Sequence, residues 1–166
     1  MGVTSTTRYD HTPQIKAEFD KLSGKAIEVG VFDGEAAWLA GIHEYGCTIP
    51  VTDKMRGWFK AQGHPLSPSK TVIVIPERSF IRAGFDANVE DVNKLEDQLV
   101  SAVAAGQISA DVLLDAVGTE MEGLVKTYAR DLSSPPDSGF TIERKGSSNP
   151  LVDTGNMIGS ITHRVV

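Results

Sequence analysis

The sequence has a single cysteine, Cys47, so no disulfide can form within the chain and the fold must rest on packing. Aromatic residues make up only 7% of the chain and do not alternate with basic residues, which disfavours a surface that stacks single-stranded nucleic acid. No run approaches the roughly 20 apolar residues that span a bilayer, and residues 1–14 lack the apolar core of a secretory signal. We therefore expect a protein that is made and kept in a cytoplasm and has no membrane partner.

Basic residues are also outnumbered by acidic ones. The chain has 16 Lys and Arg against 22 Asp and Glu, a formal net charge of −6. This balance disfavours a module that binds duplex DNA by broad neutralisation of phosphates. A length of 166 residues with 40% hydrophobic content suits one sizeable core, and we predict a single domain over residues 1–166.

Local patterns in the first part of the chain predict short elements. A flexible N-terminus over residues 1–11 precedes a helix that begins at Pro13, where the missing N–H costs nothing. Apolar residues alternate over residues 27–31, as expected for a half-buried strand. The segment 35–45 then reads as a helix that Gly46 ends.

Residues 47–70 are predicted to be an elaborated connection. Thr52 or Asp53 is placed to cap a short helix within it. The β-branched run TVIVIP that follows predicts a strand, because proline stops the run at Pro76.

Two long amphipathic helices dominate the remainder. Apolar residues recur every three or four positions from Phe85 to Val103, and again, after a restart at Ser109, over residues 112–132. Residues 133–149 hold two adjacent prolines and several serines, and are predicted to form a mobile loop or a hairpin, with FTIER as its strand-like part. A turn capped by Asp153 leads into a C-terminal strand. The predicted fold is α+β, with a small mostly antiparallel sheet of three to five strands packed against two long amphipathic helices.

One short segment has the residue types of a metal site. His43, Glu44 and Cys47 resemble part of a zinc-protease helix, in which ligands at i and i+4 share a face and the glutamate acts as a base. The second histidine is missing, and Gly46 is expected to end the helix and turn Cys47 away. The alternative interpretation has His43 packed on the sheet and Tyr45 closing the turn. A small metal-dependent hydrolase is therefore kept only as a distant hypothesis, and we expect no catalytic residue, metal or cofactor.

Four sequence landmarks occur in a fixed order: IEVGVFDG, AWLAGIHEYGCTIP, VIVIPERSFIR and NPLVDTGNMIGSITHRVV. Together, across most of residues 25–166, they resemble the tail-completion or neck proteins of tailed bacteriophages, a family also called head-tail joining or virion morphogenesis proteins. The resemblance implies a structural protein without catalysis. It also implies a cyclic homo-oligomer, such as a hexamer, at the junction between the tail and the DNA-filled head.

The same resemblance implies the partners and the location. The partners would be further copies of the chain, other neck or connector proteins, and the tail tube or tail terminator, with genomic DNA passing non-specifically through the channel. The protein would be assembled in the host cytoplasm and reside in the virion. A tail terminator that caps the tail tube is the alternative position.

The landmark residues are predicted to be architectural, because they end elements, cap turns or fill the core. They are Tyr45, Gly46, Pro76, Phe80, Asp153 and Gly155.

Subunit or partner contacts are predicted at other positions. Arg78 and Arg82 are expected to point outward and form ion pairs between subunits, although exposed arginines usually contribute little. Trp58 and Phe59 form either a small satellite core or an exposed anchor for an adjacent ring. Four residues of the loop either order against a neighbour or stay solvated: Phe140, Ile142, Arg144 and Lys145.

Overall fold

The computed structural model describes residues 10–166, and the flexible N-terminus expected over residues 1–11 falls mostly outside this range. The elements are, in chain order, α1 (Thr12–Leu22), β1 (Ile27–Gly30), α2 (Gly34–Tyr45), β2 (Cys47–Pro50), α3 (Asp53–Ala61), β3 (Val72–Ile75), α4 (Ile81–Ala104), α5 (Ala110–Asp131), α6 (Gly139–Lys145), α7 (Asn156–Gly159) and β4 (Thr162–Val165). The predicted α+β class is confirmed. Across residues 10–166, no helix combines the length and apolar character needed to cross a membrane.

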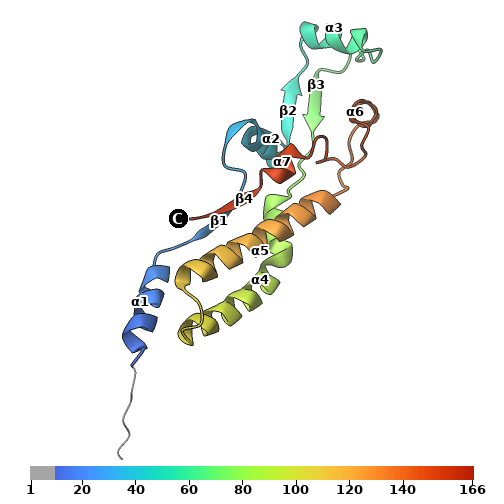
Figure 1. Cartoon of the computed structure of the whole chain (residues 1–166). Helices are drawn as coiled ribbons and strands as arrows, with labels where there is room; N and C mark the ends of the chain where they lie inside the picture. Colours follow the sequence, from blue (N-terminus) through green and yellow to red (C-terminus); the bar gives the residue numbers. More distant parts are fainter. Residues whose placement is uncertain (1–9) are drawn as a thin grey trace, which may run out of the picture.

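The core lies along the two long helices, α4 and α5, which run side by side (Figure 1). The side chain of Ser109 accepts a hydrogen bond from Val112 N and starts α5, as its position in the sequence predicts. Helix α5 supplies more of the buried hydrophobic residues than any other element, five of them at intervals of four residues: Leu113, Val117, Met121, Val125 and Ala129. Phe85 and Val112, at the starts of the two predicted stripes, are instead exposed.

The strands form two separate antiparallel pairs, so the expected single sheet of three to five strands was wrong. Strand β1 pairs with β4, from Ile27 opposite Val165 to Gly30 opposite Thr162, and this pair lies against α5. Strand β2 pairs with β3 elsewhere. The separation follows from the turn at Gly46, whose φ of 72° ends α2 and directs the chain away from the first pair.

Residues 47–75, here called the arm, project from the rest of the molecule with α3 at the far end (Figure 1). The side chain of Thr52 accepts a hydrogen bond from Met55 N and caps α3, as predicted. Arg56 fastens the return segment, because its guanidinium donates to the carbonyls of Ser67 (3.0 Å) and Lys70 (2.6 Å). The predicted connection is therefore a strand pair tipped by a helix.

The segment 133–149 contains a helix, α6, rather than a hairpin, which corrects the interpretation of FTIER as a strand. The side chain of Ser138 accepts from Thr141 N at 3.2 Å and caps this helix, and Gly146 ends it in the left-handed conformation. This local capping pattern outweighs the β propensity of a five-residue run.

The cap predicted at Asp153 was also wrong. Helix α7 has Gly155 as its N-terminal flanking residue, with φ of 82° and no side-chain cap. The side chain of Thr154 instead accepts from Asn156 N at 3.4 Å. Asp153 itself is exposed.

Candidate functional site

Glu44 joins two of the sequence landmarks. It lies near the end of α2, is almost fully buried, and its carboxylate sits at the start of α4. Oε2 accepts from Phe80 N (2.8 Å) and Ile81 N (2.9 Å), while Oε1 accepts from Arg82 N (3.0 Å) and from the hydroxyl of Ser79 (2.8 Å). A residue from a different helix thus satisfies the backbone donors that a helix start leaves unpaired.

The electrostatics of Glu44 follow from these contacts. Burial alone would raise the pKa of its carboxyl, but hydrogen bonds from the backbone of Ile81 and Arg82 and from the side chains of Ser79 and Arg82 outweigh burial and hold the pKa below its usual value. The carboxylate therefore carries one negative charge, shared by its two oxygens, and this charge stabilises the start of α4. Glu44 is not placed as a free base, which the hydrolase hypothesis requires.

Arg82 is anchored within the chain rather than projecting freely. Its Nε donates to Glu44 Oε1 at 2.9 Å and its Nη2 donates to Glu77 Oε1 at 2.7 Å. The guanidinium also lies over the ring of Tyr45, 4.7 Å from the centroid, and that ring is exposed instead of closing the turn. Half of the Arg82 side chain remains accessible, so a contact with another subunit stays a prediction.

His43 lies beside a cation, the guanidinium of Arg78. Its Nδ1 lies 3.3 Å from Arg78 Nη1. Burial lowers the pKa of the imidazole, and the positive charge of Arg78 lowers it further, so His43 is neutral at pH 7. Cys47 has passed into β2, as Gly46 predicted. Within residues 10–166, no group of three or more His, Cys, Asp and Glu side chains is placed to hold a metal ion.

Arg78 is buried, which corrects the expectation that it points outward. Its Nε donates to the carbonyl of Pro135 at 2.7 Å, and its Nη2 donates to the carbonyl of Pro136 at 3.0 Å and to Asp137 Oδ1 at 2.9 Å. The sequence could not indicate this, because all three partners lie more than 50 residues away in the chain.

Asp137 holds a second cation on its other oxygen. Lys145 Nζ lies 2.6 Å from Asp137 Oδ2, and both side chains are more than nine-tenths buried. Arg78, Asp137 and Lys145 form what we call the latch, which fastens residues 133–149 to the body. Breaking such a buried arrangement leaves an uncompensated charge and is strongly destabilising. Lys145 therefore has a partner inside the molecule.

Four of the predicted interface residues meet in one aromatic cluster between α3 and α6. The ring of Phe140 lies 5.2 Å from that of Phe59 and 6.0 Å from that of Trp58. Trp58 packs edge-on against Phe59 at 4.9 Å, and the guanidinium of Arg144 lies 5.0 Å from the Trp58 ring centroid. Phe59 is half-buried while Trp58 is 40% exposed, so the cluster is both a satellite core and an accessible aromatic surface. Ile142, the remaining loop residue, is half-buried in α6.

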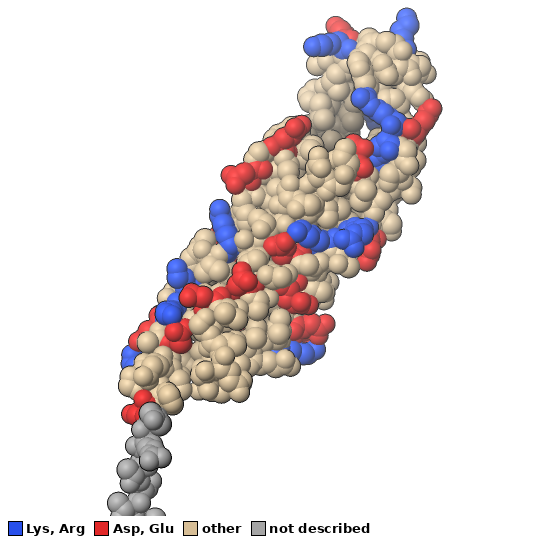
Figure 2. Space-filling model, viewed as in Figure 1, with Lys and Arg blue, Asp and Glu red and all other residues tan. Residues whose placement is uncertain are grey.

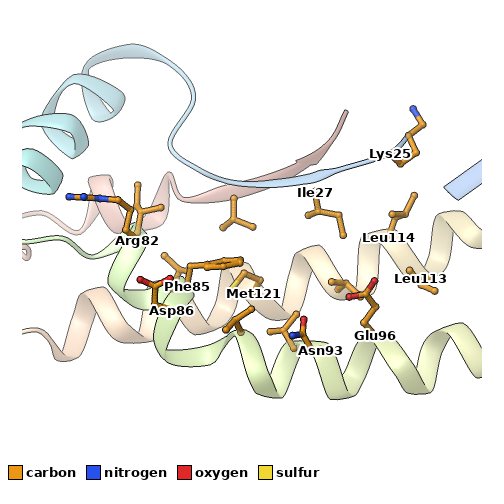
Figure 3. A pocket seen from close by; sticks show the side chains of 16 residues that line it. Lys25, Ile27, Arg82, Phe85, Asp86, Asn93, Glu96, Leu113, Leu114 and Met121 are labelled. Carbon is orange, nitrogen blue, oxygen red and sulfur yellow. The ribbon is translucent and has the colours of Figure 1, made fainter. Parts of the chain in front are cut away.

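An open groove of about 620 Å³ runs between β1 and the two long helices (Figure 3). Apolar side chains line its interior, with Ile27 projecting from β1 and Met121 from α5. Phe85 lies across it from α4 and is 46% exposed. Acidic and amide side chains of α4 stand on the rim together with two basic residues: Asp86, Asn93, Glu96, Lys25 and Arg82.

No family model matches the sequence, and no curated protein or solved structure shows significant similarity to it.

One contact at the C-terminal strand was missed in the sequence. His163 Nδ1 lies 2.9 Å from Glu122 Oε2, which also accepts from His163 N at 3.1 Å. The imidazole packs against Gly118 so closely that a Cβ there would lie 2.2 Å from the ring. A glycine inside a strong helical pattern indicates such a close approach, although it does not identify the partner.

Proposed function

We propose that the protein is a structural component of the neck of a tailed-bacteriophage virion. In this role it assembles as a ring at the head-tail junction and helps to join the tail to the DNA-filled head, without catalysis. The ordered sequence landmarks suggest this role. The arrangement of those landmarks in space supports it.

The landmarks are scattered along the chain but form one connected unit. HEYG meets IPERSF through the Glu44 carboxylate, and Gly46 lies so close to the backbone of Glu77 that a Cβ would approach Glu77 N to 2.9 Å. The final strand of SITHRVV pairs with IEVG. Leu151 of LVDTG is buried in the core, and α7 contacts α2. This convergence is the observation that carries the proposal, because it gives every landmark a role in positioning another.

The polar groups of the landmarks are engaged in the fold itself. Glu44 caps a helix and Arg78 fastens the segment before α6, so their chemistry maintains a shape. A protein whose function is its shape requires this. The net charge of −6 also suits a ring whose channel passes DNA, since a like-charged wall does not retain it.

The experiment that tests the proposal mixes the purified full chain with tails and with DNA-filled heads of the phage that encodes it. Light scattering measures the mass of the protein alone and on each particle, and negative-stain microscopy locates it. We expect a ring of added density at the head-proximal end of the tail, and more joined particles than in a control without the protein. Binding that only caps growing tail tubes would instead favour the terminator position. A protein that binds neither heads nor tails would overturn the proposal.

A further inference from the structure

Charge is distributed unevenly along the molecule. Helices α4 and α5 carry ten acidic against four basic side chains, whereas the arm carries one acidic residue, Asp53, against four basic ones. Figure 2 shows basic side chains near the α3 end and mainly acidic side chains over the half that holds α4 and α5. Two surfaces of opposite sign therefore lie on different parts of the same chain.

The charges that matter for binding are those without internal partners. Lys54, Lys60 and Lys70 of the arm are exposed and make no ion pair with any residue in the range 10–166. The same holds for Asp86 and Glu96, the two carboxylates on the groove rim. Both sets are free to meet charges on another molecule.

The arm also lacks a core of its own. None of residues 47–75 is buried, and the outer face of β3 leaves Val74 57% exposed. An isolated two-stranded pair is marginal in water, so cover from a partner would stabilise it. On α3, Lys54 and the 40% exposed Trp58 are four residues apart and share a face. That face is apolar and basic. The groove is apolar, and its rim carries the unpaired carboxylates of Asp86 and Glu96 along α4, together with Lys25 and with Arg82, whose charge is paired with Glu44 and Glu77.

We propose that α3 and the arm of one copy dock into the groove between β1, α4 and α5 of a second copy. The exposed part of Trp58 enters the apolar groove beside Phe85, while Lys54, on the same face of α3, faces Asp86 and Glu96. Lys60, on the other side of the short helix, adds positive charge to the same end of the arm. This is the helix-in-groove mode of recognition, in which apolar anchors supply affinity and flanking charges fix the register. The arm projects away from the groove of its own chain, so the docking takes place between molecules (Figure 1).

The inference rests on the proposed function and gives the ring its two contact surfaces. Docking of one patch into a different patch is heterologous, and repetition of such a contact closes a ring when the rotation between subunits allows it. The unequal ends of this chain provide the two unlike surfaces that a ring requires. An isologous dimer would need one surface that pairs with itself.

The test uses two charge reversals in the full chain. The arm variant carries Lys54→Glu and Lys60→Glu, and the groove variant carries Asp86→Lys and Glu96→Lys. Light scattering at low and high salt measures the mass of each, alone and mixed. We expect the wild type to associate more strongly at low salt, and each variant to lose about tenfold or more in association constant. A chain that carries both reversals should regain association, because the opposite charges meet again.

Mixing the arm variant with the groove variant gives the sharpest result. The unchanged arm of the groove variant meets the unchanged groove of the arm variant, and the reversed arm meets the reversed groove. The mixture should therefore associate as the wild type does, in alternating order, although neither variant does so alone. Reversal of Glu90 and Glu120 to lysine, at exposed helical positions outside the groove lining, is the matched control and should leave association unchanged. The inference would be overturned by a wild type that stays monomeric at about 1 mM and low salt. It would also be overturned by reversals that weaken binding to duplex DNA but leave self-association unchanged.

The outcomes separate this inference from the proposed function. If charge reversal abolishes self-association as expected but the wild type binds neither heads nor tails, the docking surfaces stand and the neck role fails. If the wild type joins heads to tails and both reversed variants do so equally well, the neck role stands and the docking inference fails.

Discussion

Substitution of Gly118 by alanine should destabilise the protein, although glycine to alanine within a helix usually does the opposite. Gly118 lies in the middle of α5, where alanine would be favoured by about 1 kcal/mol on helix propensity alone. The ring of His163 occupies the space that the new methyl group needs. A Cβ at position 118 would lie 2.2 Å from His163 Cδ2 and 2.7 Å from its Cγ.

The loss in free energy of unfolding can be worked out from the displacement of the His163 ring. Overpacking of this kind costs about 1–3 kcal/mol. Displacement of the imidazole also breaks its 2.9 Å contact with the Glu122 carboxylate, and a hydrogen bond to a charged group contributes about 1.5–3 kcal/mol. After subtraction of the helix-propensity gain, Gly118→Ala should lower the free energy of unfolding by about 2–4 kcal/mol. The melting temperature of a chain of this size should fall by roughly 5–15 °C.

Urea and thermal unfolding followed by circular dichroism measure the effect. Gly123 is the matched control, because it lies in the same helix and a Cβ there would meet nothing within 4 Å. Gly123→Ala should be neutral or stabilising by up to about 1 kcal/mol. In a His163→Ala background the obstructing ring is gone, so Gly118→Ala should lose its cost. Equal stability of the Gly118 and Gly123 variants would refute the reasoning.

Three further predictions concern the cap, the latch and the aromatic cluster. Because the pKa of Glu44 is lowered in the fold, its contribution to stability is present above the unfolded-state pKa of about 4.3 and is lost as pH falls through the folded value. Glu44→Gln should therefore lose about 2–4 kcal/mol at pH 7 and flatten the fall in stability below that pKa, as measured by urea unfolding between pH 3 and 7; an unchanged acid slope would contradict the capping role. Asp137→Asn leaves two buried cations without a counter-charge and should cost about 3–5 kcal/mol, whereas Asp153→Asn at an exposed position should stay within about 0.5 kcal/mol; similar losses for both would show that the latch contributes little. Phe140→Ala should expose Trp58 and red-shift its fluorescence with only about 1–2 kcal/mol of destabilisation, and an unshifted spectrum would mean that α6 does not cover this ring in solution.

Local signals in the sequence predicted the other helices but not α6, whose residues were interpreted as strand-like. Thr52 caps α3 and Gly46 ends α2 as expected, and Ser109, expected only to restart the apolar pattern, caps α5. Each acts on residues within one turn of itself. The α+β class followed from the two long apolar stripes and the β-branched runs. These features depend on neighbours in the chain, which a single sequence displays directly.

Contacts between distant segments could not be predicted in the same way. The pairing of Ile27 with Val165 spans nearly the whole described chain, and nothing in either strand identifies its partner. Arg78 reads as a surface residue, because the carbonyls and the carboxylate that bury it come from a segment that looked like a loop. Glycine at position 118 was a visible irregularity, but the imidazole that requires it lies at the other end of the sequence.

The corrections change which residues are available for assembly. Arg78 and Lys145 share the buried carboxylate of Asp137, and Arg82 is paired with Glu44 and Glu77. These three cations, which the sequence suggested as interface residues, therefore form ion pairs within the fold. A buried, paired charge contributes to an interface only if a partner disrupts its pairing, which costs more than an exposed ion pair returns. By contrast, Lys54, Lys60 and Lys70 of the arm form no ion pair with any residue in the range 10–166. Binding between copies should therefore depend on them, and should weaken with added salt as exposed charges do.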